Sequence, residues 1–243
     1  MNSMHALFAL GAFSAASGIA QAGLITTWEY TINASDGSSY AASANPGSWT
    51  AGLLPNGDTV VHGEFEAASW SIVYDLVFSD DFVDDDPLVT SNYNVINTSG
   101  DTLGFDTLTT LFVGPMPTNK MRGSISGSVG DNTLLGDTAT MSAYLDSPAY
   151  RALVDGVSVQ TLLDPFAGVT TLPNGTEVVG PEDFGVPAYI PGPAINTSIA
   201  IRNMFMITAD DSVGLQSTLN LVPAPGAVAL MGLAGLVATR RRK

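Results

Sequence analysis

A two-residue alternation of apolar and polar side chains constrains the fold of this 243-residue chain more than any other feature. Between Trp70 and Phe78 every second residue is large and apolar, while the other face carries Ser71 and Asp75. The same period recurs at 195–207 and 215–221. Successive side chains of a strand point to opposite faces, so these runs predict half-buried antiparallel strands. We expect the last two, joined by a turn at 209–212, to form a hairpin.

Weaker alternating runs, separated by Gly, Asn and Asp, predict further strands at 24–33, 59–66, 93–98, 105–113, 121–129 and 138–146. Many short strands of this kind are typical of an all-β protein, here an antiparallel β-sandwich or jelly roll. Ser147-Pro148 predicts one short helix to about Leu153, and a second helical turn is expected near 157–163. Residues 164–194 hold six of the 14 prolines and are expected to be a surface loop.

The charge of the chain is unevenly distributed. All 23 acidic residues lie between Gly23 and Leu221, with only four basic residues among them, which leaves a formal net charge of −19 for that region. Such a surface repels phosphate backbones and therefore argues against a nucleic-acid partner, whereas it favours divalent cations and neutral or cationic partners. The absence of cysteine excludes disulfides and thiolate metal sites.

The N-terminus has the pattern of a secretory signal. An apolar stretch over 6–19 ends at Ala20-Gln21-Ala22, the small-x-small pattern that signal peptidase cleaves. Residues 1–22 are therefore expected to be removed, and residues 23–221 to form one acidic β-rich ectodomain.

The C-terminus, residues 222–243, has three parts in a fixed order. Val222-Pro223-Ala224-Pro225 is followed by an apolar run over 226–238 and then by Arg240, Arg241, Arg242 and Lys243. The prolines are expected to end the preceding strand. As a helix the apolar run reaches only about 20 Å, short of a hydrocarbon core of about 30 Å. The basic cluster would stay on the cytoplasmic side.

This tail resembles the PEP-CTERM sorting domain of Gram-negative bacteria, the substrate signal of exosortases. Residues 222–225 match its Val-Pro-Glu-Pro motif except that Ala224 replaces the usual Glu. The resemblance covers about 22 residues and implies an exosortase-like membrane protease or transpeptidase as partner. It implies export, transient anchoring in the inner membrane, cleavage near the motif, and release to the surface or matrix. A permanent anchor by the same helix is the alternative.

An acidic run after the strongest strand is a candidate calcium site. Five carboxylates fall within seven residues before Pro87, and calcium is a hard cation that takes six to eight oxygens from flexible loops. The spacing is not that of an EF-hand, and a solvated loop is the default interpretation of the run. The candidate ligands are Asp80, Asp81, Asp84, Asp85 and Asp86.

His62, Glu64 and Glu66 alternate along one predicted strand and therefore share a face. Carboxylates two residues apart on a strand are separated by about 7 Å, which suits paired acid–base work on a glycoside or a metal site. Any half-exposed strand shows the same pattern. These are the only catalytic candidates, since no nucleophile elbow or phosphate-binding loop occurs in the sequence.

Three functions remain open for the ectodomain. The first is a non-enzymatic structural or adhesive role in the extracellular layer, with polysaccharide as a partner. The second is a carbohydrate-binding module, which requires exposed aromatic side chains, with Trp28, Trp49 and Tyr40 as candidates. The third is a secreted glycoside hydrolase using Glu64 and Glu66.

Overall fold

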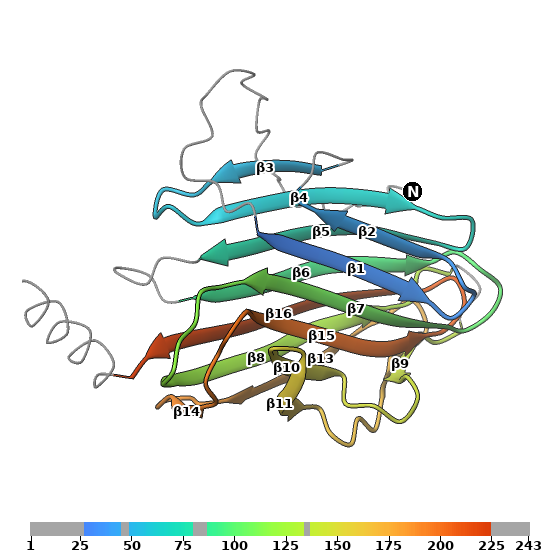
Figure 1. Cartoon of the computed structure of the whole chain (residues 1–243). Helices are drawn as coiled ribbons and strands as arrows, with labels where there is room; N and C mark the ends of the chain where they lie inside the picture. Colours follow the sequence, from blue (N-terminus) through green and yellow to red (C-terminus); the bar gives the residue numbers. More distant parts are fainter. Residues whose placement is uncertain (1–26, 45–48, 80–86, 134–136, 225–243) are drawn as a thin grey trace, which may run out of the picture.

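The computed structural model describes residues 27–44, 49–79, 87–133 and 137–224, which form an all-β sandwich of two antiparallel sheets (Figure 1). The prediction of an all-β sandwich is therefore confirmed. Each sheet has eight strands, and the two sheets bury a single hydrophobic core between them.

Sheet A has the order β11-β10-β15-β7-β1-β2, and β9 pairs with β15 and carries β12 on its other side. Residues far apart in the chain meet here, because β1, β7, β10 and β15 are neighbours. Its strands are β1 (Trp28–Ala34), β2 (Ser39–Ser43), β7 (Leu103–Phe112), β9 (Thr140–Ala143), β10 (Tyr150–Val154), β11 (Val157–Leu162), β12 (Val169–Thr170) and β15 (Ser198–Ile207).

Sheet B has the order β13-β8-β16-β6-β5-β4-β3, with β14 also paired to β8. Its strands are β3 (Trp49–Leu53), β4 (Thr59–Glu66), β5 (Trp70–Ser79), β6 (Leu88–Asn97), β8 (Asn119–Gly130), β13 (Thr176–Phe184), β14 (Ile190–Gly192) and β16 (Ser212–Pro223).

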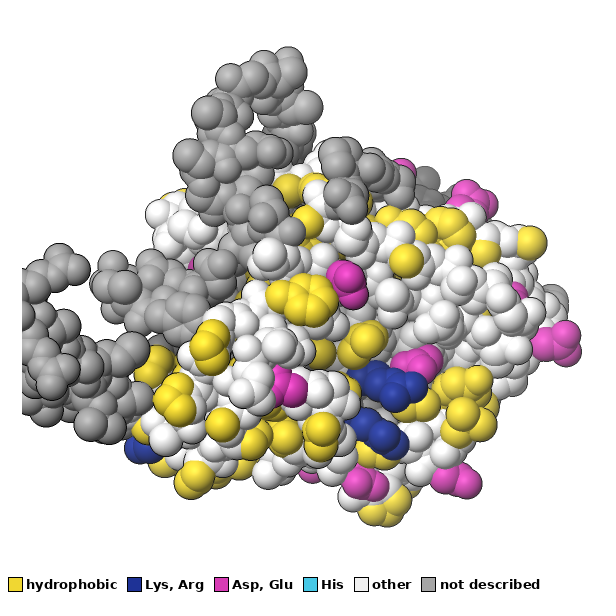
Figure 2. Space-filling model, viewed as in Figure 1, with side chains coloured by type: hydrophobic (Ala, Val, Ile, Leu, Met, Phe, Trp, Pro, Cys, Tyr) yellow, Lys and Arg dark blue, Asp and Glu magenta, His cyan; other side chains and the backbone are white. Residues whose placement is uncertain are grey.

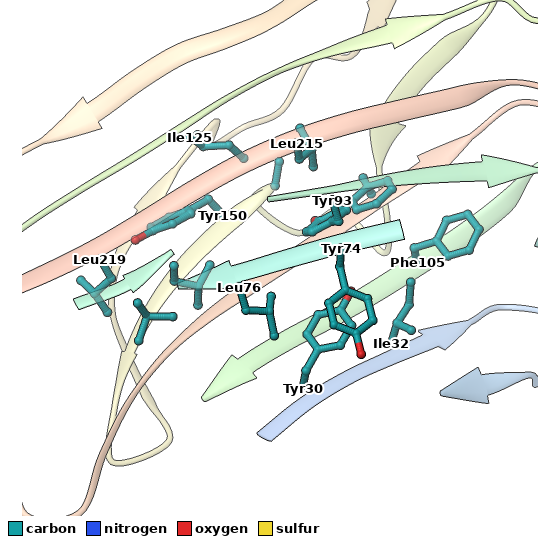
Figure 3. Close-up of a cluster of buried hydrophobic side chains, with 14 of the residues drawn as sticks. Tyr30, Ile32, Tyr74, Leu76, Tyr93, Phe105, Ile125, Tyr150, Leu215 and Leu219 are labelled. Carbon is teal, nitrogen blue, oxygen red and sulfur yellow. The ribbon is translucent and has the colours of Figure 1, made fainter. Parts of the chain in front are cut away.

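Aromatic rings from the two sheets meet in the core (Figure 3). The alternation in β5 is confirmed, because its five apolar residues from Trp70 to Phe78 are all at most 1% exposed. Across the sheets, the Tyr30 ring lies 4.8 Å from that of Tyr74, and Trp70 meets Phe105 edge-on at 5.7 Å. Such pairs add to the stabilisation that burial of the rings supplies.

The predicted hairpin between the last two strands is wrong. β15 pairs with β7, β9 and β10 in sheet A, whereas β16 pairs with β6 and β8 in sheet B. The turn at 209–212 therefore crosses from one sheet to the other. Alternation identifies the buried face of a strand but carries no information about which strand lies beside it.

The two short helices that the fold prediction included are also wrong, and no described residue is helical. β10 occupies the region after Pro148, and β11 follows at 157–162. Val154 pairs with Val157, so Asp155 and Gly156 alone connect the strands, with φ of 50° and 79°. Two positive φ angles are the signature of a type I′ hairpin turn, for which Asp-Gly is a favoured sequence.

The expectation of a long surface loop at 164–194 is only partly right. The segment contains β12, β13 and β14, and β13 pairs with β8 along most of its length. Proline is tolerated there because β13 is an edge strand.

Candidate functional site

The predicted catalytic trio lies on the outer face of sheet B. His62 is opposite Asp75 on the neighbouring strand, and its Nδ1 lies 2.9 Å from the Asp75 carboxylate. Glu64 and Glu66 are exposed on β4. They do not line the hollow described below, so the structure does not place this carboxylate pair in a cleft there.

The three aromatic candidates for sugar stacking belong largely to the core. Trp28 is 2% exposed and stacks on Phe78 with ring centroids 5.6 Å apart. Trp49 is half-buried and contacts the Trp28 ring edge-on. Tyr40 is also half-buried, and its hydroxyl lies 2.9 Å from that of Tyr74. The structure therefore does not bring the three together as an exposed platform.

Several predicted residues lie outside the described part of the chain. These are the cleavage residues Ala20 and Ala22, the acidic run from Asp80 to Asp86, and Pro225 with Arg240, Arg241 and Arg242. The first three residues of the sorting motif are described. Val222 and Pro223 are the last residues of β16, and the Ala224 N–H donates to the Thr118 carbonyl. The strand thus ends at Pro223, as the two prolines predicted.

A hollow of about 380 Å³ lies on the outer face of sheet A. The pairing register of the strands places its residues side by side. Thr31 on β1 is directly opposite Leu108 on β7, which is directly opposite Arg202 on β15. It is lined by Thr31, Asn33, Asp106, Leu108, Thr110, Leu153, Gly156, Ser198, Ala200 and Arg202.

An ion pair crosses this hollow. The Arg202 guanidinium donates from Nε and Nη2 to the two Asp106 carboxylate oxygens, at 2.7 and 2.6 Å. The Arg202 side chain is 36% exposed and that of Asp106 20%. The hydrogen bonds to Asp106 raise the pKa of Arg202 above its ordinary value. Because only Nε and Nη2 bond to Asp106, the guanidinium of Arg202 has further N–H groups that can donate to a ligand.

A second arginine stands next to this pair. Arg151 on β10 is directly opposite Arg202 on β15. Its Nη2 lies 3.2 Å from the Ser147 hydroxyl, while its Nε is buried and has no hydrogen-bond partner among the residues that the structure describes. No carboxylate among the described residues lies within ion-pairing distance of Arg151. Figure 2 shows two basic side chains side by side, with an acidic side chain beside them.

Uncommitted polar groups surround the ion pair. Asn33 is exposed and Thr31, Thr110 and Ser198 are half-buried. Their side chains make no hydrogen bond with any other described residue. The hollow therefore offers hydroxyl, amide, guanidinium and carboxylate groups around a floor that includes Leu108 and Ala200.

Asp155 organises the rim of the hollow beside Ser198. Its carboxylate accepts hydrogen bonds from the backbone N–H groups of Asn196, Thr197 and Ser198, and from the side chains of Asn196 and Thr197. Burial opposes ionisation and is the largest single influence, but the three backbone N–H donors and the Asn196 side chain together hold the pKa of Asp155 well below its ordinary value. This carboxylate is thus fully engaged in holding the start of β15.

Apart from the hollow, Asp131, Asp137 and Asp211 lie near one another where β8 ends and β16 begins. Asp211 is 2% exposed, one of its oxygens accepts from Thr208, and the other has no donor at hydrogen-bonding geometry among the described residues. Burial raises the pKa of Asp211, and the nearby charges of Asp131 and Asp137 add to this. No set of three or more His, Asp or Glu side chains in the described ranges is arranged to hold a metal ion.

The hollow was not found by sequence reasoning. Asp106 and Arg202, which line it, and Arg151, which stands beside it next to Arg202, come from three strands widely separated in the chain. The usable signal was weak: in β15 the alternation that buries Ile199 and Ile201 also places Arg202 on the outer face. Nothing local indicated that Asp106 or Arg151 would lie beside it.

Comparisons with known proteins do not assign the chain to a family. No family model matches it, and no curated protein matches it significantly. Within the described ranges, no helix has the length and apolar character needed to cross a membrane. The resemblance of the tail to the PEP-CTERM domain stays a prediction.

Proposed function

We propose that this chain is an exported, non-enzymatic β-sandwich protein of a bacterial cell surface or extracellular matrix. A signal peptide over 1–22 directs export, and the C-terminal tail, with its short apolar helix, is processed by an exosortase-like enzyme. The observation that carries the proposal is the order of parts at 222–243: a Pro-x-Pro motif, an apolar run and an Arg cluster.

The boundary of the folded part supports this order. β16 ends at Pro223, so the motif begins in the last two residues of the last described strand. At the other end β1 begins at Trp28, a few residues after the predicted cleavage at Ala22. The predicted signal peptide thus precedes the first described strand, and the predicted tail overlaps the last one only at Val222 and Pro223.

The two rival functions have less support. A carbohydrate-binding module based on Trp28, Trp49 and Tyr40 needs those rings at the surface, and Trp28 is almost completely buried. A glycoside hydrolase based on Glu64 and Glu66 needs both in a cleft around the sugar, and both are exposed on the outer face of a strand. Calcium bridging through the run Asp80 to Asp86 remains part of the proposal.

The test is the intact mass of the mature protein purified from its native host. We expect a species that begins at Gly23 and ends near residues 222–226. Replacement of Arg240, Arg241 and Arg242 by glutamine should make the tail persist, because the stop-transfer charge is removed. A wild-type species that retains residues 240–243 would overturn the sorting proposal.

A further inference from the structure

Arg151 and Arg202 place two positive charges directly opposite each other on adjacent antiparallel strands. Like charges in this position repel and destabilise a sheet. One carboxylate, that of Asp106, neutralises Arg202, and no described carboxylate pairs with Arg151. The region 23–221 has 23 acidic residues and only four basic ones. In so acidic a domain, an arginine pair with one carboxylate indicates a position for an external anion.

The surroundings of the pair limit which anion fits. Thr31, Thr110 and Asn33 supply hydrogen-bonding side chains that bond to no other residue in the described ranges. Leu108 and Ala200 add apolar contact surface between them. A sugar ring has this combination of hydroxyl groups and apolar C–H faces, and a volume of about 380 Å³ lies within the usual range for small-ligand sites.

The charge of the ligand follows from Asp106 and from the domain as a whole. The Asp106 carboxylate can accept hydrogen bonds from sugar hydroxyls, but it repels a multiply charged phosphate or sulfate. The net charge of −19 also disfavours ligands that carry several negative charges on each unit. A single carboxylate per sugar unit satisfies the unpaired Arg151 without excess repulsion.

We propose that the hollow on the outer face of sheet A binds a carboxylated saccharide, of the kind found in uronic-acid polysaccharides. Arg151, which stands at the edge of the hollow opposite Arg202, binds the carboxylate together with the free N–H groups of Arg202. Asp106, Asn33, Thr31 and Thr110, which line the hollow, bind the hydroxyls. The choice of a polysaccharide rests on the proposed surface or matrix role, because such a protein meets polymers of this class.

The experiment is calorimetric titration of the full-length protein with tetragalacturonate and with its methyl ester, which keeps the rings and removes the charge. We expect the acid form to bind at least tenfold more tightly. Arg151→Gln should weaken binding of the acid at least tenfold and of the ester little. Thr110→Val, which breaks no hydrogen bond within the described fold, should weaken both several-fold.

The matched control is Arg122→Gln, which removes the same charge from sheet B, where the guanidinium lies 4.7 Å from the centre of the Tyr189 ring. This variant should bind tetragalacturonate like the wild type. Equal losses in Arg151→Gln and Arg122→Gln, equal binding of acid and ester, or displacement by equimolar inorganic phosphate would each overturn the inference. If the protein does not bind tetragalacturonate but is processed normally in the host, only the ligand inference is overturned. If the tail is retained but the protein binds tetragalacturonate as expected, only the sorting proposal is overturned.

Discussion

Gly63 on β4 is a position where one added carbon should destabilise the whole sandwich. Its cross-strand partner is Tyr74, whose ring lies over the glycine. A Cβ at Gly63 would stand 2.2 Å from the Tyr74 hydroxyl oxygen and 2.3 Å from Cζ. Tyr74 is completely buried against Tyr30, and its hydroxyl contacts that of Tyr40, so the ring has no free space to enter.

We expect Gly63→Ala to lower the free energy of unfolding by about 3 kcal/mol, the upper end of the usual range for overpacking. For a chain of this size that lowers the melting temperature by about 6–12 °C. Urea denaturation followed by tryptophan fluorescence measures the free energy, and calorimetry measures the temperature. In a Tyr74→Leu background the same change should cost under about 1 kcal/mol, because the clashing ring atoms are gone.

The control is Gly52→Ala on the adjacent strand β3, where the nearest atom to the new Cβ would be Val60 Cγ1 at 3.8 Å. This variant should be as stable as the wild type or slightly more, because alanine restricts the unfolded chain. A Gly63→Ala protein within about 0.5 kcal/mol of the wild type would refute the packing described for Tyr74.

Three further predictions use other parts of the fold. Asp155→Ala should lower the free energy of unfolding by about 1–2 kcal/mol at pH 7, because several hydrogen bonds to residues 196–198 are lost. Because the folded pKa of Asp155 is lowered, the advantage of the wild type should be present above about pH 4 and vanish as the pH falls further. Urea titrations that show equal losses at pH 7 and pH 2 would contradict this. Asp211→Asn should stabilise the protein at pH 7. The folded pKa of Asp211 is raised, so the folded state favours the protonated carboxyl, and the stability that this carboxyl contributes is lost as the pH rises from about 4. A variant whose free energy of unfolding changes with pH as that of the wild type does would refute this. Glu64→Gln should change stability by less than about 0.5 kcal/mol and alter no glycosidase activity, and a glycosidase abolished by this substitution would favour the hydrolase.

The errors of sequence-based prediction in this chain have a common physical cause. The Ser147-Pro148 pair is an acceptable helix start, but Asp155-Gly156 a few residues later closes a tight hairpin and makes β10 and β11 strands. Pairing of β10 with β15 along its other edge adds a contact that no local signal contains. Local preference for a helical turn is weak and yields to tertiary pairing of this kind.

Strand faces were set by the sequence alone. Because side chains alternate along a strand, the residues from Trp70 to Phe78 that enter the core could be named in advance. The end of the last strand at Pro223 was also a local matter, since proline has no N–H to continue the ladder.

The composition of the hollow, and the position of Arg151 beside it, were decided only by tertiary structure. Asp106, Arg151 and Arg202 are brought together by the order β10-β15-β7 and by the register within it. Strand order and register depend on how two whole sheets bury their apolar faces against each other, which is a property of the complete core. Each residue's face is therefore readable from its own neighbours in sequence, whereas its neighbours in space are determined by the sandwich as a whole.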